Sequence, residues 1–175
     1  QPFQAKLDKI RQLRPAFAKD GTITAANASS ISDGASALIL ASQEAADQHG
    51  LKPLARMLGH TTHSRHPSEF TIAPVGAIEK LMKKLGWGVN DVDLFEINEA
   101  FAVVTLMAMD DLGLPHNKVN VFGGACAQGH PIGSTGSRII ATLIHALRTK
   151  GGKRGIASLC IGGGEATAVA VELID

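Results

Sequence analysis

The sequence predicts an α/β fold with a mixed β-sheet covered by helices. Short apolar runs alternate along the chain with amphipathic stretches of helical period. These runs are almost continuously apolar, which is typical of strands that are covered on both faces of a sheet. The last two runs flank three consecutive glycines at 162–164, so they are predicted to form an antiparallel hairpin. The sheet is therefore expected to contain both parallel and antiparallel pairs.

The first half of the chain is predicted to hold two strands and two helices. The apolar run at 35–41 is interpreted as a buried strand, and the polar stretch 42–49 as a short helix that ends at Gly50. Residues 54–59 are predicted to form a second strand. A helix is then expected over 74–86, because apolar residues recur every three or four positions between an opening proline and a closing glycine.

The second half supplies the remaining elements. Its helices are expected at 99–112 and, after a glycine-rich loop at 123–136, onward to about residue 150, each with one apolar face. Its strands are expected at 93–97, 119–122, 155–161 and 166–174. Several of these strands end in polar residues, at the sheet edge where α/β proteins build their sites.

Composition excludes several classes of protein. Seventeen Lys and Arg against sixteen Asp and Glu give a net charge of +1, which argues against a nucleic-acid or membrane-surface binder. No run approaches the roughly 18 apolar residues of a membrane span. The two cysteines, Cys126 and Cys160, are too few for a disulfide framework or a four-thiolate zinc site. We therefore expect no metal, no nucleic acid, no membrane, and a reducing, cytoplasmic location.

The first candidate site residue is Asn98, at the point where a predicted strand leads into a helix. At the carboxyl end of a strand its amide would present a donor to the ligand crevice. Asn is also a good helix cap, so a purely structural role remains open.

The second candidate is His130, which precedes Pro131 in the glycine-rich loop. Pro131 is a plausible first helical residue, and the positive end of the helix dipole would lower the pKa of His130 and keep it a neutral proton acceptor. The alternative is a surface histidine that only forms local hydrogen bonds.

The third candidate is Cys160, followed by glycines from Gly162 onward. A neighbouring histidine or donor could bring the thiol pKa toward neutrality, so that it exchanges protons. The backbone N–H groups of the glycines could form an oxyanion hole. The alternative is a buried cysteine that fills core volume beside a hairpin turn.

Considered together, Asn98, His130 and Cys160 all lie at or just beyond strand ends. The glycine loop fits neither the dinucleotide nor the triphosphate template, and no metal-binding pattern occurs. A neutral base, a second thiol for proton transfer and oxyanion donors suit thioester or acyl chemistry.

These residues resemble the motifs of the thiolases, the family of acetyl-CoA acetyltransferases and 3-ketoacyl-CoA thiolases. The sequence NEAF at 98–101 resembles one motif, GHPIG at 129–133 a second and CIGGG at 160–164 a third. The resemblance extends over essentially the whole chain. It implies a thiolase-fold C-terminal half, and a transferase of fatty acid metabolism that moves acyl groups between coenzyme A thioesters, by Claisen condensation or thiolysis.

The resemblance also implies a role for each catalytic residue. His130 would take the proton of a nucleophilic cysteine and later donate to the enolate oxygen of the bound thioester. Asn98 would hold the water that completes this oxyanion hole. Cys160 would move the proton at the α-carbon, and the backbone N–H of Gly162 would serve a second oxyanion hole.

Coenzyme A would be a substrate, and the resemblance implies no cofactor. Ser29 matches a position that touches its pantetheine arm, and Ala28, Ala100 and Phe101 would line the tunnel for this arm. Residues 61–76 depart from the usual pattern near the acyl pocket, so the preferred acyl length is left open.

One departure from the family is decisive: no counterpart of the nucleophilic cysteine is present. Cys126 lies inside the GHP loop and is not that residue. Because the chain opens at Gln1 and its first methionine is Met57, we expect an excised C-terminal domain at 20–175, preceded by a remnant of a loop region at 1–19. Such a chain would be inactive alone and would need an N-terminal thiolase domain as partner, in a full-length protein that forms a homo-oligomer.

Three alternative functions are distinguishable from the sequence. A decarboxylating ketoacyl synthase would have histidine in place of Asn98 and would not use Cys160. A non-catalytic thiolase-like domain would only bind coenzyme A esters or support oligomerisation, and would need none of the three polar residues. An independent hydrolase would require Cys126 and His130, four positions apart in a glycine loop, to converge.

Overall fold

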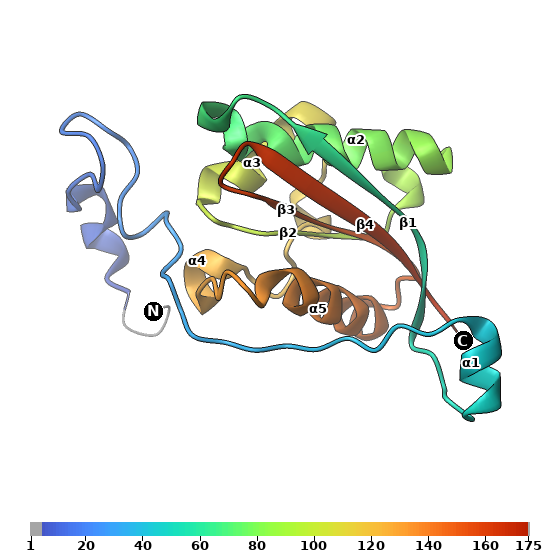
Figure 1. Cartoon of the computed structure of the whole chain (residues 1–175). Coiled ribbons are helices and arrows are strands. Elements are labelled where there is room, and N and C mark those ends of the chain that lie inside the picture. Colours follow the sequence, from blue (N-terminus) through green and yellow to red (C-terminus); the bar gives the residue numbers. More distant parts are fainter. Residues whose placement is uncertain (1–4, 175) are drawn as a thin grey trace.

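The computed structural model describes residues 5–174 and contains a four-stranded sheet with helices on both faces (Figure 1). The strands in chain order are β1 (Ala55–Ser64), β2 (Leu94–Ile97), β3 (Arg154–Cys160) and β4 (Glu165–Leu173). Their order across the sheet is β1-β4-β3-β2. Both β1 and β3 pair antiparallel with β4, whereas β2 pairs parallel with β3. The predicted α/β class, mixed sheet and terminal hairpin are confirmed.

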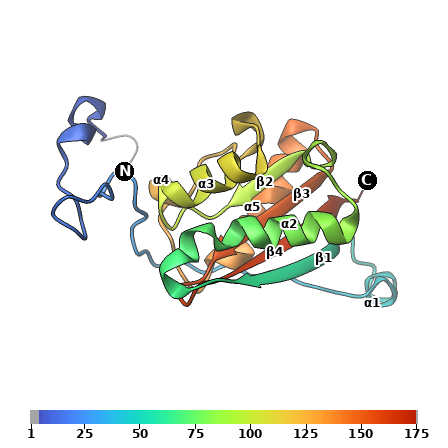
Figure 2. The same ribbon diagram turned by 90° about the horizontal axis from the view of Figure 1, so that it is seen from above.

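The helices form a layer on each face of this sheet (Figures 1 and 2). The α-helices are α1 (Gln43–Gln48), α2 (Ala73–Leu85), α3 (Ala102–Leu112), α4 (Ala125–Gln128) and α5 (Thr135–Lys150). Short 3-10 helices are η2 (Leu7–Gln12), η3 (Pro67–Ile72), η4 (Val89–Asp91) and η5 (His116–Lys118). Helices α2 and α3 lie side by side over one face, and α5 crosses the other.

Two apolar clusters fill the space between the sheet and these layers. Alternation along β2 directs Phe95 and Ile97 to the cluster under α2 and α3, and Leu94 to the cluster under α5. Glu96 shares the face of Leu94 and is only 3% exposed, so a carboxyl group lies inside the molecule on the α5 side. This buried carboxyl becomes important for the site.

Helix α2 agrees closely with the sequence pattern. Pro74 lies in its first turn, and Gly86 follows its last residue with a left-handed φ of 68°. That backbone conformation is one that glycine adopts without steric cost, which explains the stop. Helix α1 and the four sheet strands also match predicted elements within a few residues, although β1 extends five residues beyond the expected end.

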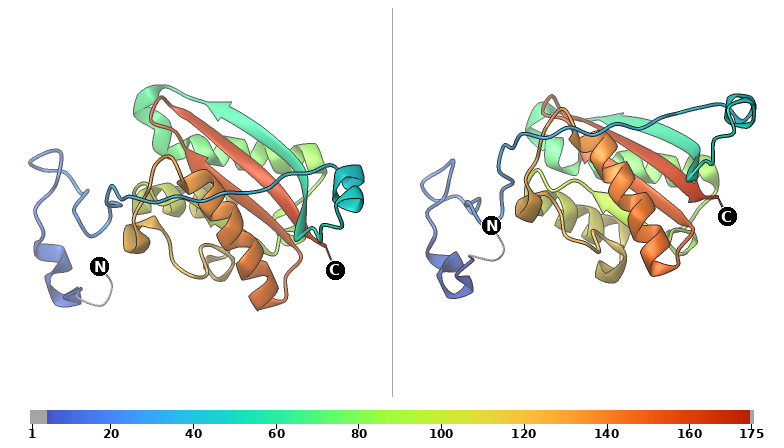
Figure 3. Two further views of the ribbon diagram at one scale, coloured as in Figure 1. Left: turned by 60° about the horizontal axis from the view of Figure 1, so that its bottom comes forward. Right: turned by 90° about the horizontal axis from the view of Figure 1, so that it is seen from below.

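The predicted buried strand at 35–41 is wrong. These residues are extended, but they belong to no strand and all are exposed, with Ile39 at 93% and Leu40 at 74%. The segment runs along the outer side of α5, away from both apolar clusters (Figures 1 and 3). An apolar run favours a strand only when a neighbouring strand or layer can cover it, and the described residues provide neither here.

Smaller differences occur around the glycine-rich loop. The predicted strand at 119–122 is reduced to one bridge between Val119 and Phe95, because Asn120 turns the chain with a positive φ of 45°. Helix α3 begins at Ala102, three residues later than predicted, and the loop contains the short helix α4. Pro131 opens a turn whose carbonyl accepts from the N–H groups of Ser134 and Thr135, and α5 begins after this turn.

Candidate functional site

The candidate site lies at the carboxyl ends of the two parallel strands β2 and β3. The backbone N–H of Asn98, directly after β2, donates to the carbonyl of Ser158 on β3 at 2.9 Å. Cys160 is the last residue of β3, two positions further along. Parallel pairing therefore brings the Asn98 and Cys160 motifs to the same edge of the sheet.

The Asn98 side chain meets the ring of His130 at this edge. The distance between Asn98 Nδ2 and His130 Nε2 is 3.4 Å, and Asn98 is only 2% exposed. The other ring nitrogen, Nδ1, lies 2.7 Å from the hydroxyl of Thr135, which donates its proton to the Pro131 carbonyl at 3.0 Å. Since a hydroxyl has one proton, Thr135 accepts from Nδ1–H. The lone pair of neutral His130 is then on Nε2, where it accepts from Asn98.

The pKa of His130 is lowered, chiefly by burial and further by the positive charge of Arg138. The direction agrees with the sequence-based expectation, and the causes are burial and the charge of Arg138, since α5 begins only at Thr135. A lowered pKa favours the neutral imidazole, which is the form that accepts a proton.

Cys160 is buried in an apolar environment. It is 7% exposed and belongs to the cluster under α2 and α3, against which Phe70 and Phe101 pack. Burial raises the pKa of its thiol to about 11. The expected pKa near neutrality is therefore wrong for this chain, because desolvation opposes the thiolate.

Gly162 lies in the exposed turn between β3 and β4. The turn is closed by hydrogen bonds from Ile161 N to Glu165 O at 2.7 Å and from Gly164 N to Ile161 O at 3.0 Å. A Cβ atom at Gly162 would meet nothing within 4 Å, and its φ is not left-handed. Packing within the described residues therefore does not require glycine at this position.

The four residues predicted to contact coenzyme A form one small unit. The hydroxyl of Ser29 donates to the carbonyl of Ala100 at 2.8 Å, and Ala28 forms an antiparallel bridge with Phe101. The structure thus brings together Ser29, Ala28, Ala100 and Phe101 from segments 71 residues apart.

The same segment also reaches the histidine loop. The N–H of His130 donates to the carbonyl of Ser30 at 2.9 Å, and Ile31 forms a parallel bridge with His130. Gly129 permits this approach, because its φ is 98° and a Cβ atom there would collide with Ser32. Residues 27–31 therefore connect the asparagine and histidine motifs.

Cys126 is placed as a structural residue. Its sulfur donates to the carbonyl of Glu99 at 3.8 Å, and its backbone N–H donates to the Glu99 carboxylate at 3.1 Å. Burial and the neighbouring carboxylate raise the pKa of Cys126 to about 11. A thiol beside a carboxylate is a poor nucleophile, which argues against a Cys126–His130 hydrolase.

Three polar residues near the site were missed by the sequence analysis. Thr135 orients His130, and Arg138 contacts Asn98. Glu96 is buried on the face of the sheet that α5 covers. A signal for Glu96 was available, since a single carboxyl within the apolar strand LFEI is unusual. For Arg138 the signal was its position one helical turn after Thr135, on the same helix face.

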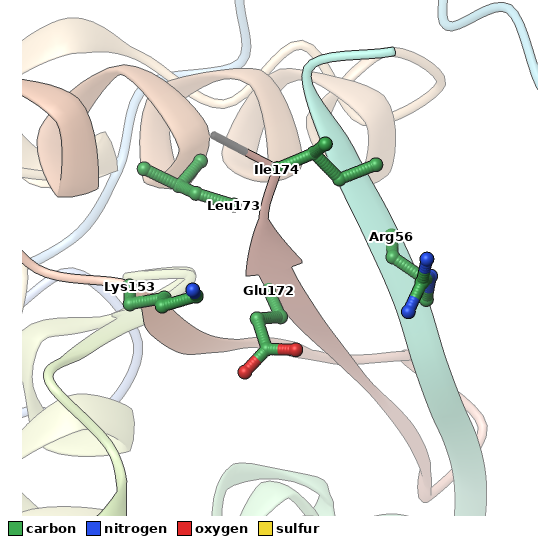
Figure 4. A pocket seen from close by; sticks show the side chains of 5 residues that line it. All are labelled: Arg56, Lys153, Glu172, Leu173 and Ile174. Atoms are coloured by element: carbon green, nitrogen blue, oxygen red, sulfur yellow. The ribbon is translucent and has the colours of Figure 1, made fainter.

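A separate hollow lies at the opposite end of the sheet (Figure 4). It is lined by Arg56, Lys153, Glu172, Leu173 and Ile174. Lys153 precedes the first residue of β3, whereas Cys160 is its last, so the hollow and the candidate site are separated by the length of this strand. Over residues 5–174, no cluster of three metal-ligating side chains occurs. Within the same residues, no helix has the length and apolar character that a membrane crossing requires.

Comparison with known proteins identifies relatives of the whole chain. The model of the thiolase C-terminal domain matches residues 51–173, and that of the thiolase N-terminal domain matches residues 2–44. An acetyl-CoA acetyltransferase of Chromobacterium violaceum is 52% identical over 168 residues, which cover 96% of this chain and 43% of that protein. Human mitochondrial 3-ketoacyl-CoA thiolase is 48% identical over 169 residues, which cover 97% of this chain and 43% of that protein.

Solved structures give the same result. The crystal structure of human mitochondrial 3-ketoacyl-CoA thiolase matches with a TM-score of 0.94 and 47% identity, covering 98% of this chain and 44% of that one. The structure of the same enzyme in complex with CoA also matches with a TM-score of 0.94. The chain spans less than half the length of these relatives. With a family model matching most of its residues, this chain belongs to the thiolase family.

Proposed function

We propose that this chain forms the C-terminal part of a thiolase that transfers acyl groups between coenzyme A thioesters. The observation that supports this most strongly is the hydrogen-bonded pair of Asn98 and neutral His130, at the edge of the sheet where β2 ends and where β3 ends in Cys160. A neutral imidazole accepts a proton through Nε2 and, once protonated, becomes a donor to a developing oxyanion. The amide of Asn98 would hold the water that is the second donor to this oxyanion.

The first proposed step loads the acyl group. The thiol of a cysteine in an N-terminal thiolase domain gives its proton to Nε2 of His130, and its sulfur attacks the thioester carbonyl. The bond to coenzyme A breaks, the leaving thiolate takes the proton from His130, and the acyl group remains on the cysteine.

The second proposed step forms or breaks the carbon–carbon bond. In condensation, the Cys160 thiol first passes its proton to Nε2 of His130, and its thiolate then removes the α-proton of a second thioester. The enolate oxygen receives hydrogen bonds from the protonated His130 and from a water held by Asn98. The carbanion attacks the acylated cysteine, whose carbonyl oxygen is stabilised by the N–H of Gly162. The bond between the acyl carbon and the cysteine sulfur breaks, and the cysteine thiolate takes back the proton from His130. Thiolysis is the reverse. The raised pKa of Cys160 supports the proton-returning direction, and condensation requires this pKa to fall when the complete site forms.

The N-terminal domain is also the proposed cover for exposed apolar surface. Ile31, Ile39 and Leu40 are between 74% and 93% exposed, and the described residues offer no partner strand to 35–41. A patch of this kind is typical of a protein interface. We propose that the segment pairs with the N-terminal domain, that the complete protein is a homo-oligomer, and that the chain divides at 19/20. The cytoplasmic location remains a prediction.

The test uses a fusion in which this chain replaces the matching 43% of the Chromobacterium violaceum acetyltransferase. We expect the isolated chain to be inactive and the fusion to cleave acetoacetyl-CoA with coenzyme A. The loss of the absorbance of the acetoacetyl-CoA enolate measures this cleavage. Cys160→Ser should reduce this rate by roughly 10²–10⁴-fold, while acylation of the enzyme by acetyl-CoA persists. Cys126→Ser is the matched control and should retain activity.

An inactive fusion that folds and binds coenzyme A would contradict the catalytic proposal. It would favour the alternative of a thiolase-like domain that only binds coenzyme A esters. An unchanged condensation rate in Cys160→Ser would reject the role of this thiol in proton transfer.

A further inference from the structure

Arg138 is the charged residue that reaches the candidate site from α5. Its guanidinium is half-buried, and Nη2 lies 3.5 Å from the amide oxygen of Asn98, a long hydrogen bond. Nη1 lies 3.3 Å from the side-chain oxygen of Gln128, in α4 before the histidine. Arg138 therefore joins the loop after β2 to the loop that precedes His130.

The chemistry of arginine decides which way the Asn98 amide faces. A guanidinium has only donors, so the atom of Asn98 that faces it must be the oxygen, Oδ1. The amide nitrogen then faces His130, and because it is a donor, Nε2 of His130 must be the acceptor. We propose that Arg138 is a positioning residue, which fixes the Asn98 amide through Oδ1 and thereby keeps the lone pair of neutral His130 on Nε2.

The hydrogen bonds of Thr135 support the same tautomer of His130 independently of Arg138. Thr135 donates to the Pro131 carbonyl and so accepts from Nδ1–H, which also leaves the lone pair on Nε2. Two separate chains of hydrogen bonds, one from Arg138 and one from Pro131, therefore specify the same tautomer. Without Arg138, the Asn98 amide could turn and present Oδ1 to an Nε2–H group, while the Thr135 hydroxyl rotates away from the Pro131 carbonyl and donates to Nδ1.

Two carboxyl groups balance the positive charge. Glu96, on β2, faces the α5 side, and burial raises its pKa to about 7 although attraction to Arg138 opposes this rise. Glu99 also attracts Arg138, and its own carboxylate is held by Asn120 Nδ2 at 2.9 Å and by the N–H of Cys126. The charged groups around His130 are thus Arg138, Glu96 and Glu99, and of these Arg138 lowers the pKa of His130.

The value of this arrangement for acyl transfer rests on the proposed function. The amide orientation and the tautomer are properties of the described chain and can be measured without any turnover. The positioning role of Arg138 can therefore fail while the proposed function holds, and the proposed function can fail while the positioning role holds.

The experiment is nitrogen NMR of the His130 ring in the 15N-labelled chain, across the pH range in which histidine titrates. The His130 signals are assigned by their loss in His130→Gln. We expect the wild-type ring to be protonated on Nδ1 when neutral. In Arg138→Met we expect a mixture with the Nε2–H tautomer, and a pKa raised by about half a unit or more, since a nearby cation is lost. Arg148→Met, at an exposed position near the end of α5, is the matched control and should change neither property.

A second variant separates loss of the contact with Asn98 from loss of folding. Removing Arg138 alone leaves the buried carboxyl of Glu96 without its cation, whereas Glu96→Gln with Arg138→Met removes both charges. We expect the double variant to be folded and to show the same mixture of tautomers, with Glu96→Gln alone keeping the Nδ1–H form.

The proposal is overturned if both variants retain the pure Nδ1–H tautomer. It is also overturned if the pKa rises while the tautomer is unchanged, because loss of charge alone explains that result. If neither variant folds while Arg148→Met does, Arg138 has a structural role and the positioning role is rejected.

Discussion

Two apolar segments, β3 and residues 35–41, resemble each other in sequence and differ completely in their surroundings. Ile156 of β3 is fully buried between β2 and β4, whereas Ile39 is 93% exposed. Both backbones are extended. Local composition therefore predicts the extended conformation, whereas burial depends on neighbours that the rest of the protein supplies.

The difference continues in the chemistry of the two regions. The compact body, residues 55–173, supplies Asn98, His130 and Cys160, whereas the extended arm, residues 21–41, contacts His130 and residues 100–102 through residues 27–31. On this view the body holds the proton-transfer groups, and the arm joins them to a partner.

His130→Ala in the fusion protein should give the largest effect. We expect both acylation and thiolysis to fall by about 10²–10⁴-fold, because the imidazole is proposed to serve both steps. Steady-state thiolysis and single-turnover acylation measure the two steps. His145→Ala, at an exposed position on α5, should stay near the unmodified rate. Acylation at full rate in His130→Ala would place the base elsewhere.

Ile156→Ala and Ile39→Ala compare the body with the arm directly. In the isolated chain, Ile156→Ala should lower the free energy of unfolding by about 2–5 kcal/mol, because it leaves a cavity between the sheet and its helices. Ile39→Ala should change it by less than about 0.5 kcal/mol, since the side chain is exposed. Urea unfolding followed by the fluorescence of Trp87, which packs against the first cluster, measures both. Equal losses would mean that the arm is buried in solution.

These two segments also show where prediction from sequence reaches its limit. The helix over 74–86 was predictable because its apolar period, its proline and its closing glycine are all local signals. The exposed, unpaired state of residues 35–41 was not predictable, because it depends on covering elements that are not encoded within the segment.

The site divides in the same way. Sequence motifs identified Asn98 and Cys160, which parallel pairing of β2 and β3 brings to one edge of the sheet, and His130, which contacts Asn98 there. The contact between Arg138 and Asn98 joins residues 40 positions apart, and the raised pKa of Cys160 depends on the surrounding cluster. Both depend on packing, which motifs do not describe.

Glu96 should make the stability of the body depend on pH. Burial raises its pKa to about 7, so the folded chain holds a proton that the unfolded chain releases above its ordinary pKa. The contribution to stability is therefore present at low pH and is lost as pH rises to about 7. The full loss is about 3 kcal/mol.

The measurement is the unfolding free energy of the wild type and of Glu96→Gln across this pH range. The difference between the two proteins should grow in favour of Glu96→Gln as pH rises, because glutamine stays neutral. Since His130 is present in both proteins, its own titration cancels. A constant difference would mean that Glu96 keeps an ordinary pKa and that Arg138 compensates its burial fully.

Ser29→Ala should give the smallest effect, at the junction of arm and body. The Ser29 hydroxyl and the Ser29 N–H both donate to the Ala100 carbonyl, at 2.8 and 3.1 Å, so one of two bonds is removed. We expect local opening of residues 27–31 to become easier by about 1 kcal/mol, measured by hydrogen exchange of the Ser29 and Ala102 amides. Ser30→Ala is the control, because that hydroxyl contacts Ser32 within the arm. If the two variants exchange alike, the backbone bonds alone hold the arm, and the hydroxyl of Ser29 is free to serve a ligand.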